Sequence, residues 1–300
     1  VDGIAHTPVL DRLAQEGVHF RQAMSIHGQC APSRCAFFTG MSPHECNVMV
    51  NTGFHVHSGQ LTTKNRTFAH EFQDAGYVTA HFGKSHLGSP LSMMGFDVGE
   101  CIDGHFPKGK EPIERIRVRE EMQARGDDSF AEAAWPENST HYKYLKQGLA
   151  WLGSYEPGDK PLLFMYDTNL PHPPFYWEQQ WRDMFKPEEM KLPKSYYKET
   201  FEGKPEFLRQ HAAVGPHKLE SEEKLREEMA QYYTLIAAVD KACGQIINVF
   251  KQKGMWDDTI VLFLSDHGDM MGGHGMTRKG TMPYEELYKV PCIVKLAKDM

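Results

Sequence analysis

The chain contains 300 residues, 40% of them hydrophobic, with a formal net charge of -7 from 33 basic and 40 acidic residues. This length can bury a sizeable core in one large α/β domain or two smaller ones, and the acidic balance excludes a general attraction to nucleic acid or to an anionic membrane. No apolar run is long enough to span a bilayer, and the first residues lack the basic-then-apolar order of a signal peptide.

The first half of the chain predicts two units in which a helix is followed by a strand, and then a long stretch of loops. Residues 7–20 begin with a cap-like Thr7 and a proline, carry apolar residues at helical spacing, and then reach a glycine before a short strand. Residues 67–83 repeat this order, with alternating apolar residues in the strand. We interpret residues 100–160 as surface loops with one helix near 142–152.

The second half predicts three strands and one long helix. Residues 161–167, "PLLFMYD", form a continuous apolar run, as expected for a parallel strand covered on both faces. Residues 173–220 are aromatic and proline-punctuated, which indicates an excursion over the surface on the substrate side. A helix begins after Ser221, and strands follow near residues 260 and 292. Alternating strands and helices favour a mostly parallel sheet between helices, with ligands at the carboxyl ends of the strands.

Polar side chains follow three of the predicted strands. Lys84 and His86 follow the first and would share a face if that strand continued, His172 lies in a proline-rich loop after the second, and Asp266 and His267 follow the third. Taken singly, each is an ordinary surface, turn or capping residue. Three such strand ends in one chain favour a shared site.

Cys30 stands where a short helix is predicted to begin. Pro32 suits the first turn and Gly40 the C-terminal stop, so the helix dipole and Arg34 favour negative charge at residue 30. Such a cysteine has a stabilised thiolate or, if modified, a stabilised oxyanion. A small buried core residue is the alternative explanation, and it suits Cys35 better. The six cysteines form no CxxC pair, so they indicate neither a zinc ribbon nor a disulfide-dense scaffold.

Four ordered motifs resemble the type I sulfatases of the alkaline phosphatase superfamily. In this chain, "CAPSR" followed by "FFTG" resembles the first sulfatase signature. "GYVTAHFGKSHLG" resembles the second signature, with Ser85 where the family usually has tryptophan. "LPHPPF" resembles the histidine loop, and "TIVLFLSDHGDMMGGHG" with "KGTMPYEE" and "VPCIV" resembles the metal and lysine segment. The resemblance runs from about Thr7 to Val294, and it implies an alkaline-phosphatase-like α/β fold.

The resemblance implies a sulfuric ester hydrolase in which a dedicated maturase oxidises Cys30 to Cα-formylglycine. It implies that Asp266 and His267 bind a divalent metal together with residue 30. The other implied site residues assist the nucleophile or the sulfate and its leaving group: Arg34 and Lys84 stabilise the nucleophile, His86 is its base, and His172 and Lys279 serve the sulfate and leaving group.

The implied chemistry explains why a cysteine stands at residue 30. An aldehyde hydrate carries two hydroxyls, one to attack sulfur and one to release sulfate afterwards, which a plain cysteine or serine lacks. Oxygen ligands and a hard anionic substrate favour Ca²⁺, whereas His267, where many relatives have asparagine, leaves Mn²⁺ open. The substrate could be an aryl or a carbohydrate sulfate ester.

We expect residues 1–300 to be a single catalytic domain truncated at both ends. By the family pattern it lacks a first strand with acidic metal ligands and a smaller C-terminal subdomain, so the ligand set would be incomplete. Family habit places such enzymes in the periplasm, outside the cell or in lysosomes.

Three alternative functions stay open at this stage. The same cations and metal would serve a formylglycine-dependent phosphonate monoester or phosphodiester hydrolase. A non-catalytic protein that binds sulfated glycans would keep the fold but leave Cys30 unmodified. A cysteine hydrolase that pairs Cys30 with a histidine would leave Arg34 and the segment around Asp266 unexplained.

Overall fold

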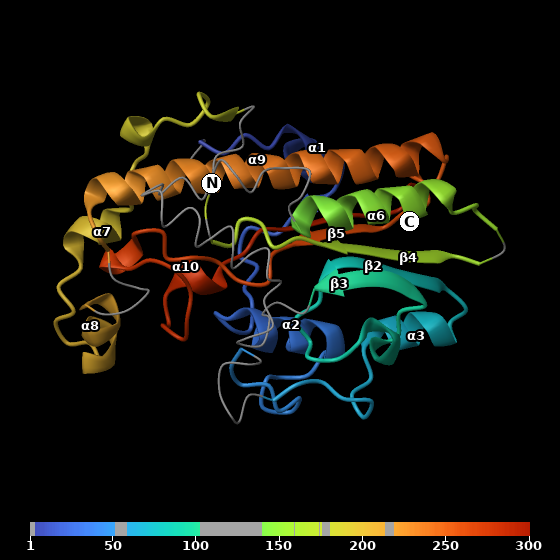
Figure 1. Cartoon of the computed structure of the whole chain (residues 1–300), viewed down its shortest axis with the longest axis horizontal. Coiled ribbons are helices and arrows are strands. Elements are labelled where there is room, and N and C mark those ends of the chain that lie inside the picture. Colours follow the sequence, from blue (N-terminus) through green and yellow to red (C-terminus); the bar gives the residue numbers. More distant parts are fainter. Residues whose placement is uncertain are drawn as a thin grey trace, which may run out of the picture.

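A computed structural model describes residues 4–51, 59–102, 140–158, 160–173, 175, 181–213 and 219–300. Within these residues the strands lie in one layer between two layers of helices (Figure 1). The α/β sandwich expected from the sequence is therefore confirmed. No helix in the described ranges is long and apolar enough to cross a membrane.

One sheet is parallel and has β2 (Val78–Lys84) at its centre, between β3 (Val98–Ile102) and β4 (Leu162–Asp167). Strand β3 overlaps the start of residues 100–160, so the interpretation of that whole stretch as loops with a helix is wrong at its first residues. Its strand was missed because its short sequence, "VGECI", contains charge and glycine rather than an apolar run. Residues 103–139 of the predicted loops lie outside the described residues.

The second sheet is antiparallel and has β6 (Cys292–Lys295) between β1 (Val18–His19) and β5 (Val261–Leu264). The alternation of helices and strands in the sequence had favoured parallel strands, and it did not predict the antiparallel pairing of this sheet. The short β1 can pair with β6 because Gly17, just before it, lies against the Val294 carbonyl too closely for a side chain.

Helices cover both faces of the strands (Figure 1). On one face lie α1 (Pro8–Glu16), α6 (Thr140–Ser154) and α9 (Glu222–Gln252), and on the other lie α2 (Cys30–Thr39) and α3 (Phe68–Asp74). The other helices of the described residues are η1 (Leu91–Met94), η3 (Pro187–Glu189), α7 (Lys194–Lys198), α8 (Glu206–Ala213), η5 (Gly273–Gly275) and α10 (Glu285–Tyr288). Much of the excursion predicted over 173–220 thus consists of short helical turns.

The expectation that β4 is covered on both faces is wrong, because every residue of this strand is only half-buried. A cavity of about 2630 Å³ lies against it. Phe164 of β4 and Phe263 of β5 line the cavity, which also reaches Arg34 and Asp266. The exposure of these apolar strands therefore comes from the cavity rather than from a solvent-facing pattern.

The N-terminus of α1 is capped from another helix. Thr7 makes no capping hydrogen bond to the backbone, contrary to its cap-like sequence position. Instead, Asp240 of α9 accepts hydrogen bonds from the backbone N–H groups of Val9 (3.2 Å) and Leu10 (2.8 Å). Because Asp240 is buried, water cannot replace it, and the contact fixes α1 against α9.

We expect Asp240→Asn to lower the free energy of unfolding by about 1 kcal/mol, since one of two backbone donors loses its acceptor. Urea denaturation measures this loss. The exposed Asp257, which pairs with Lys298 at the surface, offers the control Asp257→Asn, for which we expect less than about 0.5 kcal/mol. Equal losses in the two variants would contradict the capping role.

Candidate active site

The start of α2 holds Cys30 at the carboxyl ends of β2 and β5. The preceding residue, Gln29, is extended and Cys30 is the first residue of the helix, while Gly40 ends it with a left-handed φ of 68°. The Ala31 N–H, one of the unpaired donors of the first turn, reaches the Asn51 side chain at 2.9 Å. Cys30 is fully buried, so its polar neighbours decide its chemistry.

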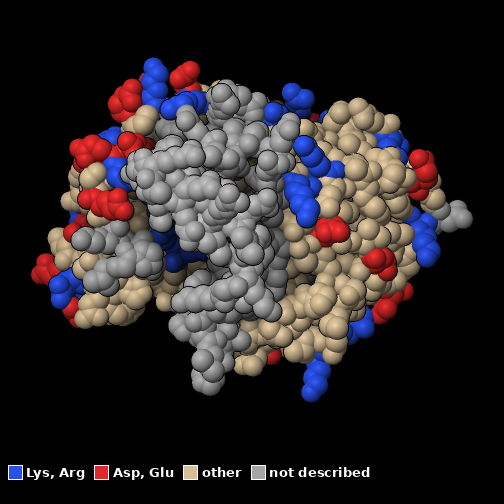
Figure 2. Space-filling model, in the orientation of Figure 1, with Lys and Arg blue, Asp and Glu red and all other residues tan. Residues whose placement is uncertain are grey.

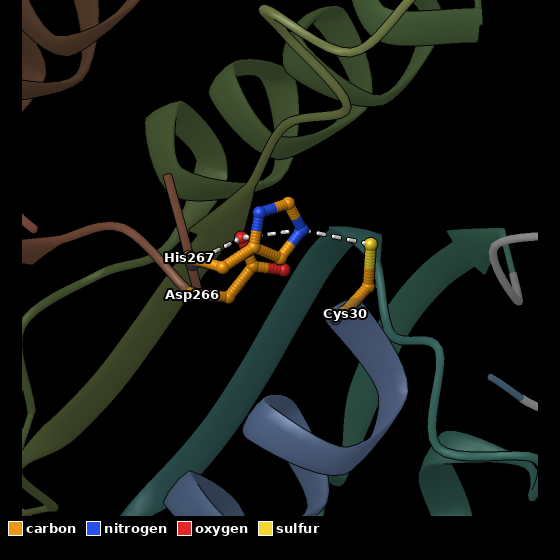
Figure 3. A group of neighbouring side chains, drawn as sticks. All are labelled: Cys30, Asp266 and His267. Carbon is orange, nitrogen blue, oxygen red and sulfur yellow. Dashed lines mark hydrogen bonds and ion pairs between the residues drawn. The ribbon is translucent and has the colours of Figure 1, made fainter. Parts of the chain in front are cut away.

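His267 is the nearest polar partner of Cys30. Its Nε2 lies 3.0 Å from the Cys30 Sγ, and the ring points at the sulfur from the loop after β5 (Figure 3). The Nδ1 atom lies 2.7 Å from the Gly268 carbonyl oxygen, so Nδ1 carries a proton and Nε2 is the atom that faces the site. This second contact fixes the orientation of the ring.

Cations around Cys30 favour its charged form. Burial alone would raise the pKa of the Cys30 thiol, but the charges of Lys84, His267 and Lys279 outweigh burial and hold that pKa well below its usual range. The cysteine therefore lies in an electropositive site within a protein that is acidic as a whole.

Asp266 lies beside the same cations without a complete set of partners. Burial would raise the pKa of its carboxyl, but the charges of His267, Lys84 and Arg34 lower it. Its Oδ2 atom is buried and has no hydrogen-bond donor among the residues that the structure describes, although Arg34 Nη1 and Lys84 Nζ lie 3.7 and 3.9 Å away. A buried carboxylate oxygen without a donor indicates space for a ligand.

The donors of Cys30, Asp266 and His267 can meet at one cation, since one atom of each lies within 4.8 Å of the others. The fixed tautomer of His267 presents Nε2, and the unsatisfied Asp266 Oδ2 supplies an anionic oxygen. These residues fit a divalent metal. An oxygen ligand suits Ca²⁺, and the imidazole suits Mn²⁺ or another transition metal.

His172 and Lys279 both interact electrostatically with Cys30 and Lys84. Burial and the charges of Lys279 and Lys84 lower the pKa of His172 to about 3. Its Nδ1 lies 2.6 Å from the Pro173 carbonyl oxygen, so a neutral ring donates there. Burial and Lys84 also lower the pKa of Lys279. The two residues thus belong to the cationic site around Cys30.

His86 does not follow the geometry expected for it. Strand β2 ends at Lys84, and His86 has a left-handed φ of 54°, so alternation along a strand does not place Lys84 and His86 on one face. His86 is buried. Its role as a base stays a prediction.

Sequence reasoning missed Asp167 and His81. Asp167 ends β4 and forms an ion pair with Arg34 (3.0 Å) and a contact with His81 Nε2 (2.7 Å). Arg34 and His81 hold the pKa of the Asp167 carboxyl at about 2, although burial would raise it. The strand-end rule that selected Asp266 would also have selected Asp167. No sequence signal selects His81, which lies inside a strand.

The depressed pKa values predict that acid destabilises the fold. The unfolded chain takes up a proton at His172 near pH 6.5, but the folded chain does so only near pH 3, so stability falls as the pH drops below about 6.5. Protonation of Asp167 also lowers the stability of the fold as the pH falls from about 4 to 2. We expect His172→Gln to flatten the decline in thermal midpoint between about pH 6.5 and 5. If the thermal midpoint of this variant declined with pH as steeply as that of the parent, the lowered pKa of His172 would be contradicted.

Known proteins are similar in sequence to this chain over almost its whole length. The sequence model of the family described as Sulfatase matches residues 2–299. An ulvan-active sulfatase of Formosa agariphila is 26% identical over 96% of this chain and 51% of that protein, and an arylsulfatase of Clostridium perfringens is 28% identical over 96% and 63%. The chain therefore spans about half to two-thirds of these relatives.

A solved structure with the same fold is the phosphonate monoester hydrolase of Agrobacterium radiobacter. The two structures superpose with a TM-score of 0.75 at 24% sequence identity. The matched region covers 98% of this chain and 64% of the hydrolase chain. At this identity the similarity establishes the fold alone.

Proposed function

The chain belongs to the sulfatase family, and from this premise we propose that it hydrolyses a sulfate monoester at the site around residue 30. The observation that carries the proposal is the buried Cys30 at a helix N-terminus, whose pKa is lowered by Lys84, His267 and Lys279. Such a site stabilises negative charge at one atom and excludes bulk water from it.

The local charges also explain how an acidic protein could accept an anionic ester. Acidic and basic side chains are interspersed over the described part of the surface in Figure 2, so the surface there offers no broad positive field. Lys84, Arg34 and Lys279 instead place positive charge at the buried end of the site. A sulfate group bound there would exchange water for these charged donors.

The nucleophile in this proposal is residue 30 after conversion of Cys30 to formylglycine by a maturase. The hydrate of formylglycine supplies a hydroxyl for attack on sulfur and a second hydroxyl for release of sulfate. Around it, Lys84 and Lys279 stabilise negative charge at position 30, and the α2 dipole adds to this effect. The enclosed position of Cys30 keeps competing water away.

Asp266 and His267 would hold the divalent metal together with residue 30. When bound, the metal supplies Lewis acidity that lowers the pKa of a hydroxyl and neutralises sulfate charge. Ca²⁺ is the metal that we propose first for the carboxylate, and Mn²⁺ is the alternative because His267 contributes nitrogen.

His172 and Lys279 would serve the departing alcohol. His172 is neutral near pH 7 and donates through Nδ1 to Pro173, so its Nε2 can accept a proton rather than give one. A bound sulfate ester would raise the pKa of His172, because its negative charge opposes the effect of Lys84 and Lys279. Substrate binding would therefore load the proton that the leaving oxygen needs.

A substrate panel tests the proposal on the full-length protein produced with a formylglycine-generating maturase. It contains 4-nitrophenyl sulfate, a sulfated monosaccharide, a phosphonate monoester and a phosphodiester, each with Ca²⁺ or Mn²⁺. We expect turnover of at least one sulfate ester with the highest kcat/KM. A higher kcat/KM for the phosphorus esters would reject the sulfatase proposal and favour a phosphonate monoester or phosphodiester hydrolase. Binding of sulfated sugar without turnover, with Cys30 unmodified, would favour the glycan-binding alternative.

Two further expectations follow from family membership. The proposed conversion of Cys30 to formylglycine needs an enzyme, so a formylglycine-generating maturase is the protein partner that we propose. A periplasmic, extracellular or lysosomal location stays a proposal, and fractionation of cells that express the full-length protein would test it.

A further inference from the structure

We propose that Asp167, held in place by His81, is a positioning residue that fixes the Arg34 guanidinium beside residue 30. The inference rests on the proposed function, because it assigns Asp167 and His81 a task in that same site. Neither residue was among the site residues expected from the sequence. Asp167 reaches the site through Arg34, and the nearest polar partner of the Cys30 sulfur is His267.

The side chains of His81, Asp167 and Arg34 contact one another in that order. His81 Nε2 lies 2.7 Å from Asp167 Oδ2, and Asp167 Oδ1 lies 3.0 Å from Arg34 Nη2. His81 is fully buried and Arg34 is 7% exposed, so water cannot take the place of either partner. A charged hydrogen bond in such surroundings holds a side chain far better than one at the surface.

The backbone of β2 and β4 brings His81 and Asp167 together, and α2 carries Arg34. Asp167 pairs with Gly83 in the parallel register, and a Cβ at Gly83 would lie 1.8 Å from the Asp167 carbonyl oxygen. Gly83 also has a φ of 113°, which a side chain would disfavour. Glycine therefore permits the close approach that places the Asp167 carboxylate near the end of β2.

Arg34 uses all the hydrogens on one edge of its guanidinium for positioning. Its Nε donates to the Ser85 carbonyl at 2.8 Å, and its Nη2 donates to the Lys84 carbonyl at 2.6 Å as well as to Asp167. Nη1 is left to face the site, where Asp266 Oδ2 lies 3.7 Å away. Asp167 thus acts together with the Ser85 and Lys84 carbonyls to determine which edge of Arg34 faces residue 30.

Asp167 also supplies a counter-charge that the metal site does not share. Without it, Arg34 would have Asp266 as its nearest carboxylate, and a closer ion pair there would compete with a cation for the same oxygen. Loss of Asp167 should therefore weaken metal binding as well as turnover. A purely structural role would affect stability alone.

His81 orients the carboxylate from inside the core. Its ring lies 5.1 Å from the Phe96 ring and 6.1 Å from the Phe38 ring, which leaves it little freedom to turn. The contact to Asp167 then fixes the plane of the carboxylate. Glutamine can offer an N–H at nearly the same place, whereas leucine cannot.

The test compares Asp167→Asn, His81→Gln and His81→Leu in the full-length, maturase-treated protein, with Asp240→Asn as the control for a buried carboxylate outside the site. The readouts are kcat and KM for a sulfate ester, and the rise in thermal midpoint on addition of Ca²⁺ or Mn²⁺. We expect Asp167→Asn and His81→Leu to lose about 10- to 100-fold in kcat and much of the metal-dependent rise. His81→Gln and Asp240→Asn should stay within about threefold of the parent.

Two outcomes would overturn the inference. One is a wild-type kcat and metal response in Asp167→Asn and His81→Leu, and the other is an equal loss in His81→Gln and His81→Leu, which would show that the donor is irrelevant. If Asp167→Asn does not fold, the two His81 variants decide alone. If the parent hydrolyses no sulfate ester, the proposed function fails, and the metal-dependent rise still tests the positioning of Arg34.

Discussion

Replacement of Cys30 by alanine is expected to lower kcat/KM for a sulfate ester by roughly 10⁴-fold or more, because the nucleophile is lost. Removing the nucleophile also removes any benefit from the groups that activate it, so further substitution of Lys84 should add little. A serine at residue 30 should be almost as inactive, since a serine lacks the second hydroxyl of an aldehyde hydrate. Steady-state kinetics on the full-length protein measures all three effects.

Cys35 offers a matched control for this experiment. It is equally buried and lies on the same helix, but it packs in the core with Phe38 and Leu61 rather than in the site. Cys35→Ala should lower the free energy of unfolding by about 1 kcal/mol and leave kcat/KM nearly unchanged. A Cys30→Ala variant as active as Cys35→Ala would remove residue 30 from the mechanism.

Asp266→Asn is expected to lower kcat by roughly 10²- to 10³-fold, because the metal loses its anionic ligand among the described residues and the site loses charge balance. The same variant should need far more Ca²⁺ or Mn²⁺ for half-maximal activity. Chelation should inactivate the parent protein, and the metal that restores activity at the lowest concentration is the one that the site prefers. Titration of activity against metal concentration measures both effects.

Asp240→Asn separates metal binding from the general cost of changing a buried aspartate. Asp240 accepts backbone hydrogen bonds at the start of α1, and so its replacement should reduce stability without altering the metal requirement. A similar metal requirement in Asp266→Asn and the parent would show that the cation, if used, binds elsewhere.

The regular elements could be predicted because local signals and burial agree. The helix that begins at Cys30, the long helix after Ser221 and the apolar strand at 162–167 all lie where the sequence places them. Prolines, glycines and capping residues mark their ends through backbone geometry, which needs no knowledge of distant contacts. The strand-end rule grouped Asp266 and His267 with the ends of other strands. Their grouping with Cys30 came from the resemblance to the sulfatases, and the structure brings one atom of each residue within 4.8 Å of the others.

Features that depend on contacts between distant segments could not be predicted. The antiparallel direction of β6 and the cap that Asp240 gives to α1 are set by packing, and neither leaves a local trace. The left-handed backbone at His86 invalidated an argument from strand alternation. His81 resembles any polar residue in a strand until β4 places Asp167 against it.

Mass spectrometry of the peptide that contains residue 30 tests the central claim most directly. The protein is the full-length chain, expressed together with a formylglycine-generating maturase, and the Cys35 side chain in the same region serves as the internal reference for an unmodified thiol. We predict an aldehyde or its hydrate at residue 30 and an intact thiol at residue 35. An intact thiol at residue 30 under these conditions would contradict the proposed nucleophile.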